Sequence, residues 1–286
     1  MRFAADLLAE LRLALHGHPV PRVRALHLPP LAAAESRSGE FCAIELDDGA
    51  LGMSFVLLDE SLQQLTAAGD MRARLAGMDA LQLAEGFSGE GEGESEGPDF
   101  IAPALRRTLG FAAANALSRS VMNRIGFTPP PARDSIAGID PQAGDHIGMI
   151  GLFTPLLNQI TAAGARLTVI ELRSEWAGDF DGYRVTTDAS ALLDCNKVLS
   201  TSTVLLNHSI DHMLQHCRNA GHIALIGPGA GCLPGPLFAR GISVIGGSWI
   251  TDPAAFIAAL QSGDSWSAFA CKFAMRATDW PGLPRP

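Results

Sequence analysis

Residues 145–173, DHIGMIGLFTPLLNQITAAGARLTVIELR, decide the fold of this 286-residue chain. Residues 146–152 form an almost unbroken apolar run, as expected of a parallel strand that is buried on both faces. Residues 167–172 have the same character and are predicted to form the adjacent strand. Between them, Pro155 is expected at the start of a helix and Gly164 at its end. A strand, a helix and a second strand make a βαβ unit. The chain should therefore contain an open parallel sheet, whose ligands bind outside the carboxyl ends of the strands.

Composition limits the classes of partner. The formal net charge is -9, with 21 basic and 30 acidic residues, so no broad basic face is expected for nucleic acid or for an anionic membrane. Residues 1–19 have the leucine spacing of an amphipathic helix and lack the apolar core of a signal peptide. No apolar run is long enough to span a bilayer. The five cysteines are scattered and form no CxxC pair, which favours reduced thiols in a cytoplasmic protein.

The first half predicts a smaller α+β domain over residues 1–137. Its pattern indicates a short strand at 23–28, a hairpin at 41–58, and helices at 61–76 and 102–125. Helices follow strands here and do not alternate with them, which is typical of α+β folds.

Two segments of this chain carry no periodic pattern. Residues 85–98, EGFSGEGEGESEGP, have too few apolar side chains to build a core, so a mobile surface loop without a site is expected. Weak cation binding by its carboxylates is the less favoured interpretation. Residues 128–144 are rich in proline and glycine and mark the expected boundary to a second domain, residues 138–286.

The second domain continues the alternation of strands and helices, which predicts a Rossmann-like sheet of about five strands. Small, glycine-rich or hydroxyl-bearing residues follow most of these strands. Such residues let a ligand approach backbone amides and supply neutral hydrogen-bonding groups. The predicted ligand-binding residues at the strand ends are Gly151, Phe153, Thr154 (also the expected helix cap), Glu171, Arg173, Ser200, Thr201, Ser202, Thr203, Asn207 (an expected helix cap), Gly227, Pro228 and Gly229.

The first of these turns specifies no particular cofactor. It is neither GxGxxG nor a Walker loop, although free amides at the start of the following helix would favour an anionic group. Glu171 lies near the place where Rossmann proteins bond a ribose hydroxyl. Alternatively, Glu171 pairs with Arg173 or caps the strand end.

A run of histidines follows the hydroxyl-rich loop. His208, His212 and His216 are spaced at i, i+4 and i+8, and on a helix they would lie opposite the apolar stripe. The simpler interpretation is a solvated polar face. The alternative is a metal site in which His208 and His212 chelate a transition metal and Asp211 adds a carboxylate.

Four blocks of the second domain together resemble a known family, putative heavy-metal chelation. The blocks are residues 147–173, 199–214, 224–238 and 248–260, in the right order, and the likeness extends over about residues 138–276. In the first domain, GFAAANALS at residues 110–118 matches a helix of the family that carries an asparagine, here Asn115.

This resemblance implies an architecture and a site. The Rossmann-like domain would follow a smaller domain that resembles the N-terminal domain of enolase, and the ligand would bind in the cleft between them. The implied site includes Asn115 and most of the strand-end residues. His208 replaces a small residue expected in relatives, so a metal role there is a hypothesis for this sequence alone.

Three functions remain open from the sequence. The favoured one is a cytoplasmic protein that binds a small anionic or metal-bearing ligand in the cleft, in metal homeostasis or metal-cofactor handling, with a transition metal ion or metal chelate as the cofactor. The second is an enzyme, for example a transferase, that uses a nucleotide-like cofactor such as S-adenosylmethionine. The third is a scaffold whose cleft is vestigial. No catalytic residue is identified, and a homo-oligomer is compatible with the sequence.

Overall fold

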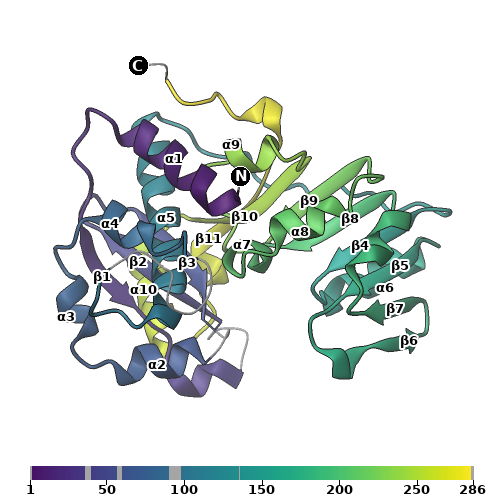
Figure 1. The fold of residues 1–286 in the computed structure, drawn as a ribbon, viewed down its shortest axis with the longest axis horizontal. Coiled ribbons are helices and arrows are strands. Elements are labelled where there is room, and N and C mark those ends of the chain that lie inside the picture. The colour runs from purple at the N-terminus through teal and green to yellow at the C-terminus, as the bar shows by residue number, and fades with distance from the viewer. Residues whose placement is uncertain (1, 36–39, 57–59, 90–97, 135, 285–286) are drawn as a thin grey trace.

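The computed structural model describes residues 2–35, 40–56, 60–89, 98–134 and 136–284. Two sheets organise it, a three-stranded antiparallel sheet in the first half and an eight-stranded sheet in the second, which runs from the middle of the molecule to the right-hand edge of Figure 1. The fold is therefore a Rossmann-like α/β domain preceded by a smaller α+β domain, as the sequence predicts. The strands of the larger sheet, in their spatial order, are β11 (Ala270–Met275), β10 (Val244–Ile250), β9 (His222–Ile226), β8 (Lys197–Thr201), β4 (His146–Ile150), β5 (Arg166–Ile170), β7 (Tyr183–Thr186) and β6 (Gly178–Phe180).

Six strands of the larger sheet are parallel, and their order is that of a Rossmann fold. From β4 the chain proceeds outward to β5 and β7, and it then returns to β8 and proceeds the other way to β9 and β10. The direction of winding thus reverses between β4 and β8. In open α/β sheets this switch point is where the carboxyl ends of the strands leave a crevice for a ligand.

Among the helices of this half, α8 is shorter than the sequence pattern predicts, because His208 and His216 lie outside it. Helix α6 begins one residue earlier than expected, at Thr154, so Thr154 is not its N-cap and Pro155 is its second residue. Gly164 follows the helix with a φ of 76°, as a glycine after a helix end often does. The helices are α6 (Thr154–Ala162), α7 (Thr203–Leu206), α8 (Ile210–Gln215), α9 (Gly235–Phe238) and α10 (Pro253–Ser262).

Three strands of the larger sheet were not predicted. Strands β6 and β7 form a hairpin where the chain crosses from β5, and their pattern of exposed residues gave no sign of a buried strand. Strand β11 pairs antiparallel with β10 through six residue pairs and exposes the adjacent residues Cys271 and Lys272. The hairpin and β11 lie at the two edges of the sheet, where strands are short and partly solvated and so carry weak sequence signals.

The smaller domain consists of the predicted hairpin, one further strand and a set of helices. The predicted helix at 61–76 is interrupted at Gly69, and Asp79 caps a short helix that was not predicted, by accepting bonds from two backbone amides. The elements are α1 (Phe3–Leu15), β1 (Val23–His27), β2 (Phe41–Leu46), β3 (Leu51–Phe55), α2 (Ser61–Ala67), α3 (Met71–Leu75), α4 (Ala80–Glu85) and α5 (Pro103–Arg124).

The expected acidic surface loop begins later than predicted. Phe87 is fully buried, and its ring stacks on Phe111 of α5 at 4.7 Å between ring centroids. The first residues of the 85–98 segment therefore belong to the core, because a single large aromatic ring is enough to hold them there. Residues 90–97, which carry most of the glutamates, lie outside the described residues.

Helix α5 lies directly against β3, and a glycine permits this contact. A Cβ atom on Gly52 would overlap the backbone of Ala112 and Ala116. The same helix contributes to a hydrophobic cluster that contains residues of both halves, including Leu117 of α5 and Leu205 of α7. The segment 128–144 also joins the sheet locally, since Ala132 donates its N–H to the carbonyl of Lys272.

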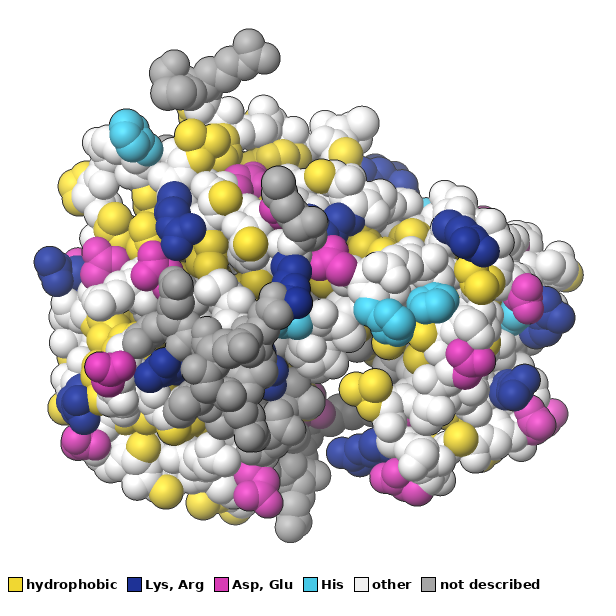
Figure 2. Space-filling model, viewed as in Figure 1, with side chains coloured by type: hydrophobic (Ala, Val, Ile, Leu, Met, Phe, Trp, Pro, Cys, Tyr) yellow, Lys and Arg dark blue, Asp and Glu magenta, His cyan; other side chains and the backbone are white. Residues whose placement is uncertain are grey.

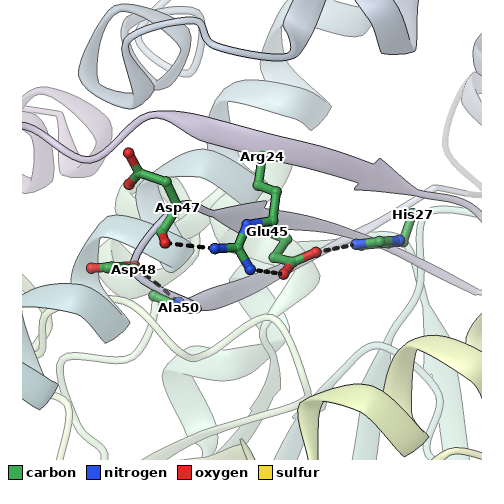
Figure 3. A network of polar contacts seen from close by, with 6 residues as sticks. All are labelled: Arg24, His27, Glu45, Asp47, Asp48 and Ala50. Carbon is green, nitrogen blue, oxygen red and sulfur yellow. Dashed lines mark hydrogen bonds and ion pairs between the residues drawn. The ribbon is translucent and has the colours of Figure 1, made fainter.

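A polar network crosses the small sheet (Figure 3) and continues to a helix of the second half. Glu45 of β2 accepts from Arg24 at 3.0 Å and from His27 Nε2 at 2.9 Å, both on β1. His27 is 7% exposed, and its Nδ1 lies 3.1 Å from Gln261 of α10. Because the carboxylate can only accept, Nε2 carries the proton and Nδ1 accepts from the amide of Gln261. The network thus fixes α10 to the small sheet.

Helix α1 presents a buried carboxyl group to the start of α9. A Cβ atom on Gly235 would lie 2.6 Å from the oxygens of Glu10, so the carboxyl group packs on the glycine backbone. This burial raises the pKa of Glu10 to about 7. The folded state therefore binds this proton more tightly than the unfolded state. The stabilisation that it provides is present at pH 4.5 and is lost as the pH rises through 7.

We expect Glu10→Gln to stabilise the protein at pH 8 by about 1 kcal/mol, an amount that allows for the partial exposure of the group. At pH 5 most of this difference should disappear, because the carboxyl group of the folded wild type is then protonated. Urea unfolding followed by circular dichroism at both pH values checks this. An equal difference at pH 5 and pH 8 would contradict the assignment.

The described surface mixes charges of both signs. On the face drawn in Figure 2, basic and acidic side chains alternate over both halves. Within the described ranges, no helix combines the length and apolar character needed to cross a membrane.

Candidate functional site

A cavity of about 810 Å³ lies at the switch point of the larger sheet. It is bounded by the turns after β4, β5 and β8, by the start of α6 and by Phe55 of β3, so it lies between the two halves of the chain. Its volume is within the range of sites for organic ligands. The lining residues are Glu40, Phe55, Ile150, Gly151, Leu152, Phe153, Pro155, Leu156, Gln159, Ile170, Glu171, Leu172, Arg173, Trp176, Thr201, Thr203, Val204, Asn207, Ser209, Met213, Ile226 and Lys272.

The turn after β4 forms one wall of this cavity, and only glycine suits its first position. Gly151 has a φ of 81°, and a Cβ atom there would lie 2.9 Å from the Thr201 methyl group on the neighbouring strand. Thr154 is exposed and does not line the cavity, whereas Phe153 does.

The backbone amides of this turn are less available to a ligand than the sequence predicts. Leu152 N donates to Glu171 Oε2 at 3.3 Å, and Phe153 N faces the sulfur of Met149 at 3.4 Å. Pro155, the second residue of α6, has no N–H. The carboxylate of Glu171 thus already supplies a negative charge where a phosphate would bind in a dinucleotide-binding protein.

Glu171 also fixes the second wall. Its Oε1 accepts from Leu172 N at 2.8 Å and from Arg173 N at 3.4 Å, so one carboxylate joins the turns after β4 and β5. The predicted side-chain pair with Arg173 does not form, because that guanidinium group lies over the ring of Trp176, 4.8 Å from its centroid. A carboxylate offers about four lone-pair positions, which leaves room for one ligand donor.

The four hydroxyl groups after β8 divide into two pairs. Thr201 and Thr203 line the cavity, and the hydroxyl group of Thr201 donates a hydrogen bond to that of Thr203, with 3.1 Å between the oxygen atoms. Ser200 and Ser202 are buried at 4% and 5% exposure and face away from it. Ser200 and Thr201 end β8 and point to opposite faces of the sheet, whereas Ser202 leads directly into α7, which begins at Thr203.

Asn207 lines the cavity but has a different local role from the predicted one. It ends α7, and its Oδ1 accepts from Ser209 N at 3.1 Å and from the Ser209 hydroxyl at 2.6 Å. It therefore forms a turn before α8 and is not the helix N-cap.

The remaining predicted residues lie beside the main cavity. Gly227 and Pro228 line a second cavity of about 190 Å³, which shares Ile226 and Lys272 with the first. Asn115 is 3% exposed and donates to the carbonyls of Met53, at 2.8 Å, and Gly229, at 3.2 Å. Asn115 thus joins the two halves beneath the cleft.

The predicted metal site does not assemble as a helical stripe. His208 precedes α8, with a φ of 58°, and its ring packs edge-on against Phe87 at 5.1 Å. Burial lowers the pKa of His208. The carboxylate of Asp211 accepts from Arg240 at 2.7 Å and from Phe3 N at 2.9 Å, so both of its oxygens are engaged in holding α1 against α8.

On α8 itself, His212 has another histidine as its neighbour. The rings of His212 and His216 lie 5.0 Å apart on the surface of the helix. Within the described part of the chain, no group of three or more His, Cys, Asp or Glu side chains is placed to hold a metal ion. The described residues that line the main cavity include no cysteine and no histidine.

Sequence reasoning missed several residues of the cavity. Phe55 and Glu40 come from the first half, Trp176 from the crossover after β5, and Lys272 from β11. The first two could not be placed without knowing how the halves pack. Trp176 ends a short 3-10 helix before β6, and Lys272 lies on β11, neither of which was predicted. A lysine in a chain with only two, Lys197 and Lys272, was nevertheless a signal available in the sequence.

Comparisons with other proteins agree with the α/β fold described above. The model of the DUF364 family, described as "Putative heavy-metal chelation", matches residues 135–278. The chain belongs to this family. No functionally curated protein matches it.

Two solved structures of the family have the same fold. A DUF364 protein of unknown function from Desulfitobacterium hafniense DCB-2 is 17% identical, with a TM-score of 0.67 over 95% of this chain and 98% of that one. One from Pyrococcus horikoshii is 13% identical, with a TM-score of 0.64 over 96% and 100%. A mandelate racemase/muconate lactonizing enzyme from Polaromonas sp. JS666 aligns with a TM-score of only 0.33, which is too low to carry an argument.

Proposed function

We propose that the protein binds a small organic ligand, or a metal ion already held by an organic chelator, in the cavity between its two halves. The observation that carries this proposal is the 810 Å³ cavity at the switch point of a sheet with Rossmann order. Most of its lining is apolar or aromatic, with a few convergent polar groups from the strand ends, which is the composition of a small-molecule site.

The donor chemistry favours a ligand with an organic body over a bare heavy-metal ion. Soft metals prefer thiolate and thioether sulfur, and zinc, copper and nickel also bind imidazole; the described lining offers no thiolate or imidazole and a single thioether, Met213. A metal chelate would bring its own donor atoms and need only the shape and charge of the cavity. The five cysteines are free, which fits the reduced environment that we propose for it, the cytoplasm.

One specific observation supports a second function, that of a nucleotide-binding enzyme. Glu171 directly follows β5, the second strand in the Rossmann order, where an acid bonds ribose hydroxyls in nucleotide-binding proteins. An enzyme that uses S-adenosylmethionine would then be stabilised by that cofactor against heat, and Glu171→Gln would remove the shift. In the turn after β4, however, the amides of Leu152 and Phe153 already have protein partners and are not free for a cofactor phosphate. We therefore prefer the first function, binding of an organic ligand or a metal chelate.

The fluorescent anion 1-anilinonaphthalene-8-sulfonate tests the proposed site, since it combines an aromatic body with one negative charge. We expect saturable binding of one molecule per chain, with energy transfer from Trp176 that Trp176→Phe reduces. Gln159 lines the cavity from α6, so the larger side chain of Gln159→Trp should occupy part of the cavity. We expect this substitution to weaken dye binding at least about tenfold.

Asn158→Trp provides a matched control, because Asn158 is an exposed neighbour on the same helix and is not part of the lining. This variant should bind the dye like the wild type. Equal binding by both tryptophan variants would place the dye elsewhere and would contradict the proposal.

A further inference from the structure

Lys272 is the one lysine of this chain that has no partner among the described residues. The other, Lys197, donates to Asp145 at 2.7 Å and to the carbonyl of Asp140 at 2.8 Å, so it stabilises the fold. No hydrogen bond or ion pair within the described ranges engages the ammonium group of Lys272. That charge therefore remains available to a ligand.

The position of Lys272 relates it to the cavities. It lies on β11 opposite Ser248, two residues beyond the point where β10 pairs with the end of β9, and thus at the carboxyl end of β10. It lines both the 810 Å³ cavity and the 190 Å³ cavity. The smaller cavity adds Gly246, Gly247 and Ser248 of β10 and the glycine-rich turn after β9, whose polar groups could solvate an acid.

The far end of the larger cavity carries both a carboxylate, Glu171, and a guanidinium group, Arg173. Glu171 lies at the end of β5, and five strand spacings separate β5 from β11. At about 4.8 Å for each spacing, the two strand ends are roughly 24 Å apart. Between them the lining is largely apolar and includes Phe153, Val204 and Met213. Because the positive charge of Arg173 offsets the charge of Glu171, that end has little net charge, and an acidic group is attracted more strongly to Lys272.

We infer that Lys272 binds the acidic end of an elongated organic acid whose apolar body lies along the strand ends toward Glu171. This inference rests on the proposed function and adds the orientation and the chemical class of the ligand. A hydrogen-bond donor, such as a hydroxyl or an ammonium group, suits the other end of such a molecule, because the carboxylate of Glu171 can accept it.

Dodecanoate, dodecylamine and 12-aminododecanoate test this orientation, since they share one apolar chain and differ in their end groups. Titrations of the full-length protein by calorimetry, below the micellar concentration, give their affinities. We expect Lys272→Glu to weaken dodecanoate about five- to tenfold and to leave dodecylamine unweakened. Glu171→Gln should weaken dodecylamine and spare dodecanoate. For 12-aminododecanoate, both substitutions should weaken binding, and 6-aminohexanoate should bind more weakly because it cannot reach both ends.

Arg184→Glu is the matched control, because it makes the same change of charge at an exposed position of β7 that does not line the main cavity. It should leave the affinity for dodecanoate unchanged. If Lys272→Glu and Arg184→Glu have equal effects, or if the wild type binds no dodecanoate, the inference is wrong. A third outcome separates the two proposals: Gln159→Trp loses dodecanoate binding and Lys272→Glu keeps it. Dodecanoate would then bind in the proposed cavity, but Lys272 would not bind its carboxylate.

Discussion

Replacing Gly52 with alanine should destabilise the protein by at least about 3 kcal/mol. The new Cβ atom would overlap the backbone of α5 at Ala112 and Ala116, and backbone atoms cannot move aside as a flexible side chain does. The helix would have to move away from β3. That movement would open the cluster that contains Phe111, Leu117 and residues of the second half. Urea unfolding followed by circular dichroism gives the loss directly.

Gly69→Ala is the control for this substitution. Gly69 lies between α2 and α3, and a Cβ atom there would meet no atom within 4 Å. Its stability should equal or slightly exceed that of the wild type, because alanine has less freedom to lose on folding. A loss of similar size at both positions would show that the close approach of α5 to β3 does not determine the effect.

The second large effect is expected at Arg240, which joins α1 to α8. Its guanidinium group donates to Asp6 at 2.6 Å and to Asp211 at 2.7 Å, and only 13% of the side chain is exposed. Arg240→Ala would leave two half-buried carboxylates without their cation. We expect a loss of about 2 kcal/mol, between the values for surface pairs and for fully buried pairs.

Salt and a second variant check the origin of that loss. Arg184→Ala removes an exposed arginine that lies 3.9 Å from Asp179, and it should cost less than about 0.5 kcal/mol. The Arg240 effect should persist at high salt, since partly buried pairs are screened less than exposed ones. Equal losses in the two variants would mean that Arg240 contributes no more than a surface charge.

The sequence predicts those parts of the fold that local patterns determine. The apolar runs of β4 and β5, with Gly164 after the intervening helix, suffice to predict the βαβ unit and from it the parallel sheet. The hairpin around residues 47–49 is equally local. By contrast, β11 depends on pairing with β10 and shows no strong pattern of its own, so its lysine was overlooked as a site residue.

The candidate site was predictable to the same extent. Strand-end reasoning places Gly151, Glu171 and Thr201 around one cavity, because the ends of parallel strands meet at one edge of the sheet. It could not tell that the carboxylate of Glu171 binds the amides of its own turns, since that depends on side-chain geometry. The histidine hypothesis assumed a helix that continues through residue 208, whereas the chain turns there with a positive φ.

A crystal structure of the protein with 1-anilinonaphthalene-8-sulfonate tests the central claim, that the cavity between the halves is a binding site for an organic ligand. We predict density for the aromatic body between Phe55 and Phe153, with the sulfonate group directed toward Lys272. An empty cavity in crystals that hold the dye at another place, or in crystals soaked at saturating concentration, would contradict the claim.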